Sequence, residues 1–138
     1  MISDSSMKIT LETLPHILFD LHPWDRIFLR GKLGSWKTTL SQALIRRFLK
    51  DDNISVTSPT YTYYQPYPNN LYHFDLYRVE HLTDIVRIGA EEIFDNDESI
   101  CIIEWPEVLG DSIKPTKIIE LNETEGWREI RITDCQAS

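Results

Sequence analysis

The sequence lacks several features that mark membrane, secreted and metal-binding proteins. No apolar run approaches the ~18 residues that cross a bilayer, and residues 1–10 hold no apolar stretch of the kind a secretory signal needs. The two cysteines, Cys101 and Cys135, stand far apart, without a C-x-x-C partner or a nearby histidine cluster, so zinc and redox motifs are absent. We therefore expect a protein of the reducing cytoplasm, not attached to a membrane, with Cys101 in the core.

Positive charge is also scarce. Fourteen lysines and arginines stand against 22 acidic residues, which gives a net charge of −8. Nucleic-acid affinity comes largely from basic side chains that displace counterions from phosphates, so the chain is not expected to bind nucleic acid strongly by itself. Arg30, Lys32 and Lys37 nevertheless gather within a few positions, where they can attract a small anion.

The 138 residues are 41% hydrophobic and 26% charged, which are ordinary values for a globular protein. This length is enough for one real core and too short for a second. No repeat or low-complexity segment interrupts it. We predict a single domain over residues 1–138.

Apolar periodicity places the secondary structure. Helices are predicted at residues 14–21, 38–49 and 83–94, the last in two pieces around Gly89. Strands are predicted at residues 8–11, 26–29, 54–56, 71–77, 100–103, 117–121 and 127–133. An extended aromatic segment, 61–67, should form a hairpin with 71–77, placing Tyr72 and Phe74 on a core face and His73 and Asp75 on a chemical one. The run 100–103 suits a central strand buried on both faces, and the last two strands suit an antiparallel hairpin at the sheet edge.

The segment from Arg30 to Thr39, R-G-K-L-G-S-W-K-T-T, resembles a phosphate-binding loop between a strand and a helix. The motif is G-x-x-x-x-G-K-[ST], in which backbone N–H groups surround phosphate, the lysine adds charge and the hydroxyl holds Mg²⁺. Gly31, Lys37 and Thr38 occupy their positions in the motif, but Trp36 replaces the second glycine. The alternative is a glycine-containing turn before an ordinary helix.

A carboxylate follows the most apolar strand. Glu104 ends the run 100–103, and a carboxylate at the carboxyl end of a strand can reach Mg²⁺ held by Thr38. Many strands end in glutamate, so Glu104 indicates a magnesium site only in combination with the phosphate-binding loop.

Other polar residues have two interpretations each. Asp75 can orient a water or a metal-bound water, or pair with Arg78. His73 is interpreted as a hydrogen-bonded core residue. Thr60 can touch a γ-phosphate or serve turn chemistry, and Trp105 can face a partner or fill the core.

Three short sequence motifs downstream of the loop resemble those of a known family. S-P-T-Y-T (58–62), Y-H-F-D-L-Y-R (72–78) and I-E-W-P-E (103–107) resemble the TsaE (YjeE) family in type and order. That family consists of bacterial P-loop ATPases required for threonylcarbamoyladenosine formation on tRNA. The resemblance runs from the first helix to the W-R-E-I-R-I ending.

The resemblance implies a fold and an activity. The fold is an α/β, P-loop NTPase-like central parallel sheet extended by antiparallel strands, with helices on both faces. The implied cofactors are ATP and Mg²⁺, and the implied partner is the TsaB–TsaD complex, so that tRNA is met only indirectly.

The resemblance also implies roles for individual residues. Lys37 would contact the β- and γ-phosphates, Thr38 and Glu104 would serve Mg²⁺, and Thr60 and Asp75 would lie in two switch-like segments. Lys37, Thr60 and Asp75 are therefore the candidate catalytic residues. The residues expected to line the ATP site are Gly31, Leu33, Gly34, Ser35, Trp36, Lys37, Thr38 and Thr39.

The chain departs from the family loop, G-D-L-G-A-G-K-T, at two positions, Lys32 and Trp36. Glycine adopts conformations costly to other residues, and strain of ~1–3 kcal/mol would weaken ATP binding roughly 5- to 150-fold. The leading hypothesis is therefore an ATPase with weakened ATP handling. Alternatives are a subunit of the same complex without nucleotide activity and, last, a small-molecule kinase, for which no lid is evident.

Overall fold

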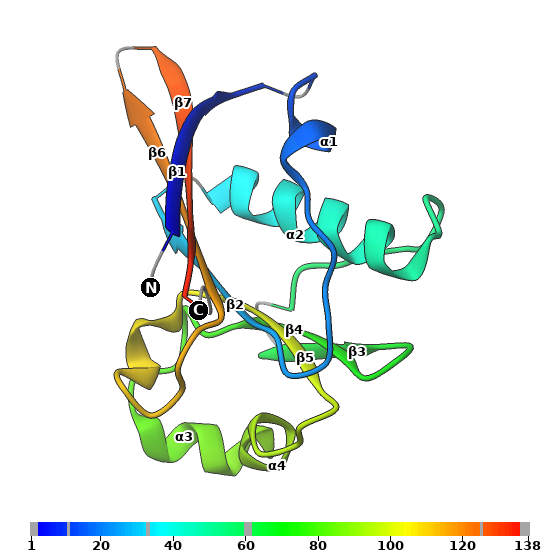
Figure 1. The fold of residues 1–138 in the computed structure, drawn as a ribbon. Helices are drawn as coiled ribbons and strands as arrows, with labels where there is room; N and C mark the ends of the chain where they lie inside the picture. The colour runs from blue at the N-terminus through cyan, green and yellow to red at the C-terminus, as the bar shows by residue number, and fades with distance from the viewer. Residues whose placement is uncertain (1–2, 11, 33, 60–61, 125, 136–138) are drawn as a thin grey trace.

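A seven-stranded mixed sheet runs through the protein (Figure 1). The computed structural model describes residues 3–10, 12–32, 34–59, 62–124 and 126–135. In spatial order the strands are β1 (Ser3–Ile9), β7 (Trp127–Asp134), β6 (Lys117–Thr124), β2 (Arg26–Gly31), β5 (Ile100–Glu104), β4 (Leu71–Asp75) and β3 (Tyr64–Tyr67). Strands β6, β2, β5 and β4 are parallel, and β3, β7 and β1 extend them by antiparallel pairing. The predicted fold class is confirmed.

Helices cover both faces of this sheet (Figure 1). On one face lie α1 (Leu14–Ile17) and α2 (Gly34–Leu49), and on the other α3 (Leu82–Arg87), α4 (Ala90–Phe94) and the 3-10 helix η1 (Pro106–Leu109). Each face has its own apolar cluster, one containing Leu44 and the other Phe94. No helix in the described parts of the chain is long and apolar enough to cross a membrane.

The most apolar stretch forms the central strand, as predicted. All five residues of β5 are buried, and the strand lies between β2 and β4. Cys101 is fully buried there, and burial raises the pKa of its thiol to about 11. The thiol is therefore neutral at physiological pH, as a core residue requires.

Two predictions near the beginning of the chain are wrong. Helix α1 ends at Ile17 instead of residue 21, because Leu18 adopts an extended backbone with φ −67° and ψ 152°. The apolar side chains that follow pack on the core from an extended segment. Strand β1 is also longer than predicted and pairs with β7, so the C-terminal hairpin is not at the sheet edge.

The strand predicted at residues 54–56 is absent from the described structure. Side chains of α2 bind the backbone there instead: Gln42 Nε2 donates to Val56 O at 3.2 Å, and Arg46 Nε donates to Ile54 O at 3.4 Å. The predicted β3–β4 hairpin and the pair α3 and α4 around Gly89, with φ 77°, are confirmed.

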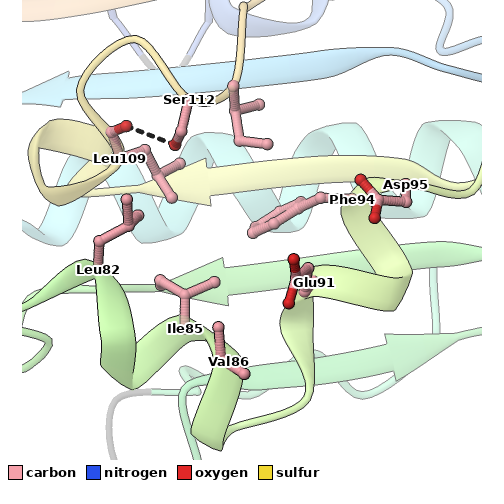
Figure 2. Close-up of a pocket in the computed structure, with 9 residues that line it drawn as sticks. Leu82, Ile85, Val86, Glu91, Phe94, Asp95, Leu109 and Ser112 are labelled. Carbon is pink, nitrogen blue, oxygen red and sulfur yellow. Dashed lines mark hydrogen bonds between the residues drawn. The ribbon is translucent and has the colours of Figure 1, made fainter.

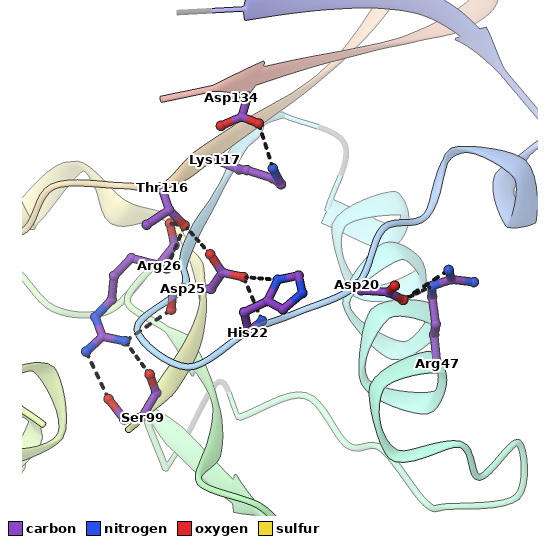
Figure 3. Close-up of polar contacts among 9 residues, drawn as sticks. All are labelled: Asp20, His22, Asp25, Arg26, Arg47, Ser99, Thr116, Lys117 and Asp134. Carbon is purple, nitrogen blue, oxygen red and sulfur yellow. Dashed lines mark hydrogen bonds and ion pairs between the residues drawn. The ribbon is translucent and has the colours of Figure 1, made fainter. Parts of the chain in front are cut away.

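A buried polar network fixes the N-terminal ends of the central strands (Figure 3). The Arg26 guanidinium is 1% exposed and donates to Ser99 O at 2.7 Å and to Phe94 O at 3.1 Å. The Arg26 backbone N–H donates to Thr116 Oγ1, which in turn donates to Asp25 Oδ1. These bonds join β2, β5 and the segment before β6, and they leave the opposite, carboxyl ends of the strands for the candidate site.

Candidate functional site

The predicted loop lies between a central strand and a long helix. Strand β2 ends at Gly31 and α2 begins at Gly34, which is earlier than predicted, so Trp36 and Lys37 are helical. The first N–H groups of an α-helix have no partners within it, and they favour anions. Of the predicted residues, Leu33 and Thr60 lie outside the described residues, and only the backbone of Gly34 and Ser35 is described.

Gly31 is required by its neighbour on β6. Its φ is +134°, and a Cβ atom there would lie 2.2 Å from the backbone oxygen of Leu121. The backbone of β6 therefore passes too close for any side chain, a reason for glycine that the motif alone does not give.

The loop lysine is turned into the protein. Lys37 is fully buried, its Nζ donates to Gly31 O at 2.6 Å, and Nζ lies 3.3 Å from the centroid of the Trp105 ring. Burial lowers the pKa of Lys37, and the nearby charge of Glu104 opposes this effect. The lysine thus has a backbone acceptor and an aromatic cover in place of an external anion.

Trp105 has a role that the sequence did not predict. It has a left-handed backbone, with φ 56°, and its ring contacts Tyr77 at a centroid distance of 5.0 Å. The half-buried indole is neither core filling nor wholly exposed, because it covers Lys37. Its place directly after the acid that ends a buried strand, before Pro106, was the only available signal.

Three of the predicted residues meet in one hollow of about 480 Å³. Thr38 comes from α2, while Asp75 and Glu104 end β4 and β5 and face each other in the parallel ladder. Lys32, Ser58, Tyr77 and Trp105 complete the lining, whereas Thr39 is half-buried on α2 and is not among these residues. Hydroxyl and carboxylate oxygens are the ligands that Mg²⁺ prefers.

The Glu104 carboxylate is held from two elements. His73 Nε2 lies 2.6 Å from Glu104 Oε2, and Ser41 Oγ donates to the same oxygen at 3.3 Å. His73 is therefore a hydrogen-bonded core residue, as predicted. Ser41 was missed, although it lies one helical turn beyond Lys37, to whose carbonyl it also donates.

Asp75 is fixed by its own neighbours. Its Oδ1 accepts the Tyr77 N–H at 3.0 Å, and its backbone N–H donates to Tyr63 O at 2.9 Å. The side chains of β4 alternate as predicted, but both faces are core, because His73 and Phe74 are each fully buried. A strand within a parallel region is covered on both sides, which the hairpin interpretation did not consider.

The Trp36 indole points away from this hollow. It packs against the apolar cluster under α2, and the Arg128 guanidinium lies 4.8 Å from its ring centroid. It lines a different hollow, shared with β1 and the β6–β7 hairpin. Because Trp36 is helical, the left-handed strain expected at a glycine position does not arise in this conformation.

Another hollow lies between α3, α4 and η1 (Figure 2). Its volume is about 230 Å³, its lining is mainly apolar, and its acidic members are Glu91 and Asp95. The residues that line it include no lysine or arginine, so this hollow offers nothing to a phosphate. The hollow beside the loop, lined by Lys32, Thr38 and the carboxylates of Asp75 and Glu104, is the candidate nucleotide site.

Comparisons with known proteins identify the family of this chain. The family model described as "Threonylcarbamoyl adenosine biosynthesis protein TsaE" matches residues 5–131. A Rickettsia typhi protein named "tRNA threonylcarbamoyladenosine biosynthesis protein TsaE" is 35% identical over 106 residues, covering 75% of this chain and 71% of its own. The protein of the same name from Haemophilus influenzae is 38% identical over 111 residues, covering 77% and 68%.

The fold is shared with a solved structure, the crystal structure of Bacillus subtilis YdiB. The TM-score is 0.64 at 22% sequence identity, over 97% of this chain and 87% of the other. The family model covers nearly the whole chain. The chain belongs to the TsaE family of tRNA threonylcarbamoyladenosine biosynthesis proteins.

Proposed function

We propose that this protein binds and hydrolyses Mg-ATP beside the loop and so supports formation of N6-threonylcarbamoyladenosine on tRNA. The observation that carries the proposal is the convergence of Thr38, Asp75 and Glu104 in one hollow at the carboxyl ends of parallel strands. Lys37 lies in the first turns of α2, directly before Thr38, which lines this hollow. Ligands of open α/β sheets bind at this end of the strands.

Each side chain has a distinct part in the proposal. Lys37 would leave Gly31 O and contact the β- and γ-phosphates, which are stronger acceptors than a neutral carbonyl. Thr38 and Glu104 would hold Mg²⁺, whose charge offsets the charge of the phosphates. Asp75 would orient the attacking water, with Thr60 near the γ-phosphate.

The N-terminus of α2 supports the proposed phosphate binding, and we propose that Trp36 weakens this binding in the following way. A helical N–H group at Trp36 is still a donor, but the loop must open around the phosphates before those donors can surround them. For the loop to open, Trp36 must adopt backbone conformations that glycine adopts easily and other residues do not. The cost therefore falls on binding and not on the nucleotide-free fold.

The proposed partner is the TsaB–TsaD complex, with tRNA bound by that complex and not by this chain. The net charge of −8 supports an indirect contact with tRNA. Phosphate release from ATP, measured with and without TsaB–TsaD, tests the coupling. An equal rate in the two conditions would contradict this partnership.

The structure also offers support for a subunit of the same complex that no longer handles nucleotide. Lys37 is already bonded to Gly31 O and covered by Trp105. If Lys37 never leaves these contacts, the loop keeps its fold but cannot bind the phosphates of ATP. Titration of the unaltered chain with Mg-ATP separates the two proposals.

Replacing Trp36 with glycine should strengthen Mg-ATP binding roughly 5- to 150-fold, because it removes ~1–3 kcal/mol of conformational cost. Isothermal titration calorimetry measures the change directly. Trp36→Ala is the matched control, since it removes the indole but keeps a Cβ atom.

The two variants distinguish the indole from the backbone. If alanine restores binding as well as glycine does, the indole itself is the obstacle. If neither variant differs from the unaltered chain and all bind Mg-ATP, the explanation built on Trp36 is wrong. If none binds, the subunit without nucleotide activity is the better account.

A further inference from the structure

The histidine of β4 is bonded to the carboxylate to which the proposed function assigns Mg²⁺. His73 Nε2 and Glu104 Oε2 are 2.6 Å apart, and both side chains are buried. In the β4–β5 ladder His73 faces Ile102, so Glu104 is its diagonal neighbour on the same face. The contact is therefore set by the register of two central strands.

The hydrogen of this bond belongs to the histidine. A carboxylate only accepts hydrogen bonds, so Nε2 is the donor. The other ring nitrogen, Nδ1, is buried and makes no hydrogen bond to any described residue. The only contact that the described structure gives the polar atoms of this ring is therefore the one to Glu104.

Both donors to Glu104 use the same oxygen. His73 and Ser41 contact Oε2, and within the described chain Oε1 takes part in no hydrogen bond. Glu104 lines the hollow that Thr38 also lines. One oxygen is thus held by the protein while the other is left for a cation.

We propose that His73 is a positioning residue that fixes the Glu104 carboxylate so that Oε1 serves the cation of Mg-ATP. Partners behind a metal ligand orient it, and their loss typically lowers metal affinity about 10- to 100-fold. This inference rests on the proposed function. The competing view is that His73 only fills the core, in which case an apolar side chain of similar size would serve as well.

The metal dependence of ATP binding tests the proposal without using activity. ATP affinity is measured by calorimetry in Mg²⁺ and in EDTA, and the ratio of the two affinities reports the contribution of the metal. His73→Leu should lower this ratio about 10- to 100-fold while leaving the affinity in EDTA unchanged. His73→Gln, whose amide N–H can replace the Nε2 donor, should retain most of the ratio.

A double-mutant cycle tests whether His73 acts on metal-dependent ATP binding through the Glu104 carboxylate. In a Glu104→Gln background, His73→Leu should cause no further loss of the ratio, because the group that His73 positions is gone. Thermal melting without nucleotide shows whether each variant is folded. If His73→Leu does not fold, His73→Asn replaces it, because its shorter amide keeps polarity without reaching Oε2.

The outcomes separate this inference from the proposed function. An unaltered chain that shows no Mg²⁺-dependent ATP binding overturns both. A normal ratio in folded His73→Leu or His73→Asn overturns the positioning role alone. Loss in both the leucine and glutamine variants would also contradict it, because the restored donor should rescue the metal contribution.

Discussion

Replacing Arg26 with methionine should lower the free energy of unfolding by about 3–5 kcal/mol, because the guanidinium makes several buried hydrogen bonds and each one to a charged group contributes about 1.5–3 kcal/mol. The guanidinium donates to carbonyl oxygens of Phe94, at the end of α4, and of Asn96 and Ser99, between α4 and β5. Methionine fills similar volume but donates no hydrogen bond, so these carbonyls lose their charged donor, although Ser99 O and Asn96 O still accept backbone N–H groups. Equilibrium unfolding in urea, followed by circular dichroism, measures the loss.

An exposed arginine provides the matched control. Arg47 contacts Asp20 at 3.1 Å, with both side chains largely exposed, and such pairs contribute only about 0–1 kcal/mol. Arg47→Met should therefore change stability little. If the two methionine variants lose the same amount, the network in Figure 3 does not hold the central strands together.

Replacing Gly31 with alanine should destabilise the protein by about 2–6 kcal/mol, the sum of backbone strain and overpacking. The added Cβ would lie 2.2 Å from Leu121 O, an atom fixed in the pairing of β2 with β6. The same variant should also lose Mg-ATP binding, because β2 leads directly into the loop. Urea unfolding and the soluble fraction on expression check the first effect.

Gly110 is the matched control for this experiment. It also has a positive φ, of 53°, but apart from its two chain neighbours no atom of the described residues lies within 4 Å of an added Cβ. Gly110→Ala should cost about 1–3 kcal/mol, because φ 53° with ψ −127° is a sparsely populated conformation for a residue with a side chain. Equal losses in the two variants would mean that conformation matters and the close approach of β6 does not.

Elements with strong local patterns were predictable from the sequence. The uninterrupted apolar run of β5 predicts a central strand buried on both faces. The spacing of Leu40 and Leu44 predicts the buried face of α2. The loop was located by the spacing of Gly31, Lys37 and Thr38. Thr38 and Glu104 are expected to lie close together because ligands of α/β sheets bind at the carboxyl ends of parallel strands, and both residues line the same hollow.

Other features depend on contacts that no local pattern records. Ser3–Ile9 is a strand because β7 pairs with it, and its polar beginning gives no apolar alternation. Leu18 continues a helical spacing but packs from an extended backbone. The cover over Lys37 joins a helix to Trp105, a residue far along the chain, through a side-chain contact that spacing does not determine.

The pairing pattern of the sheet has a consequence for how the protein folds. Strand β2 lies between β5 and β6, with Arg26 facing Cys101 and Gly31 facing Leu121. Strand β1, at the start of the chain, pairs with β7, at its end. Nearly every central pair thus joins distant parts of the chain, a topology that slows folding. During synthesis β2 remains unpaired until β5 has emerged and β1 until β7 has emerged, and in that interval their exposed edges make the nascent chain prone to aggregation.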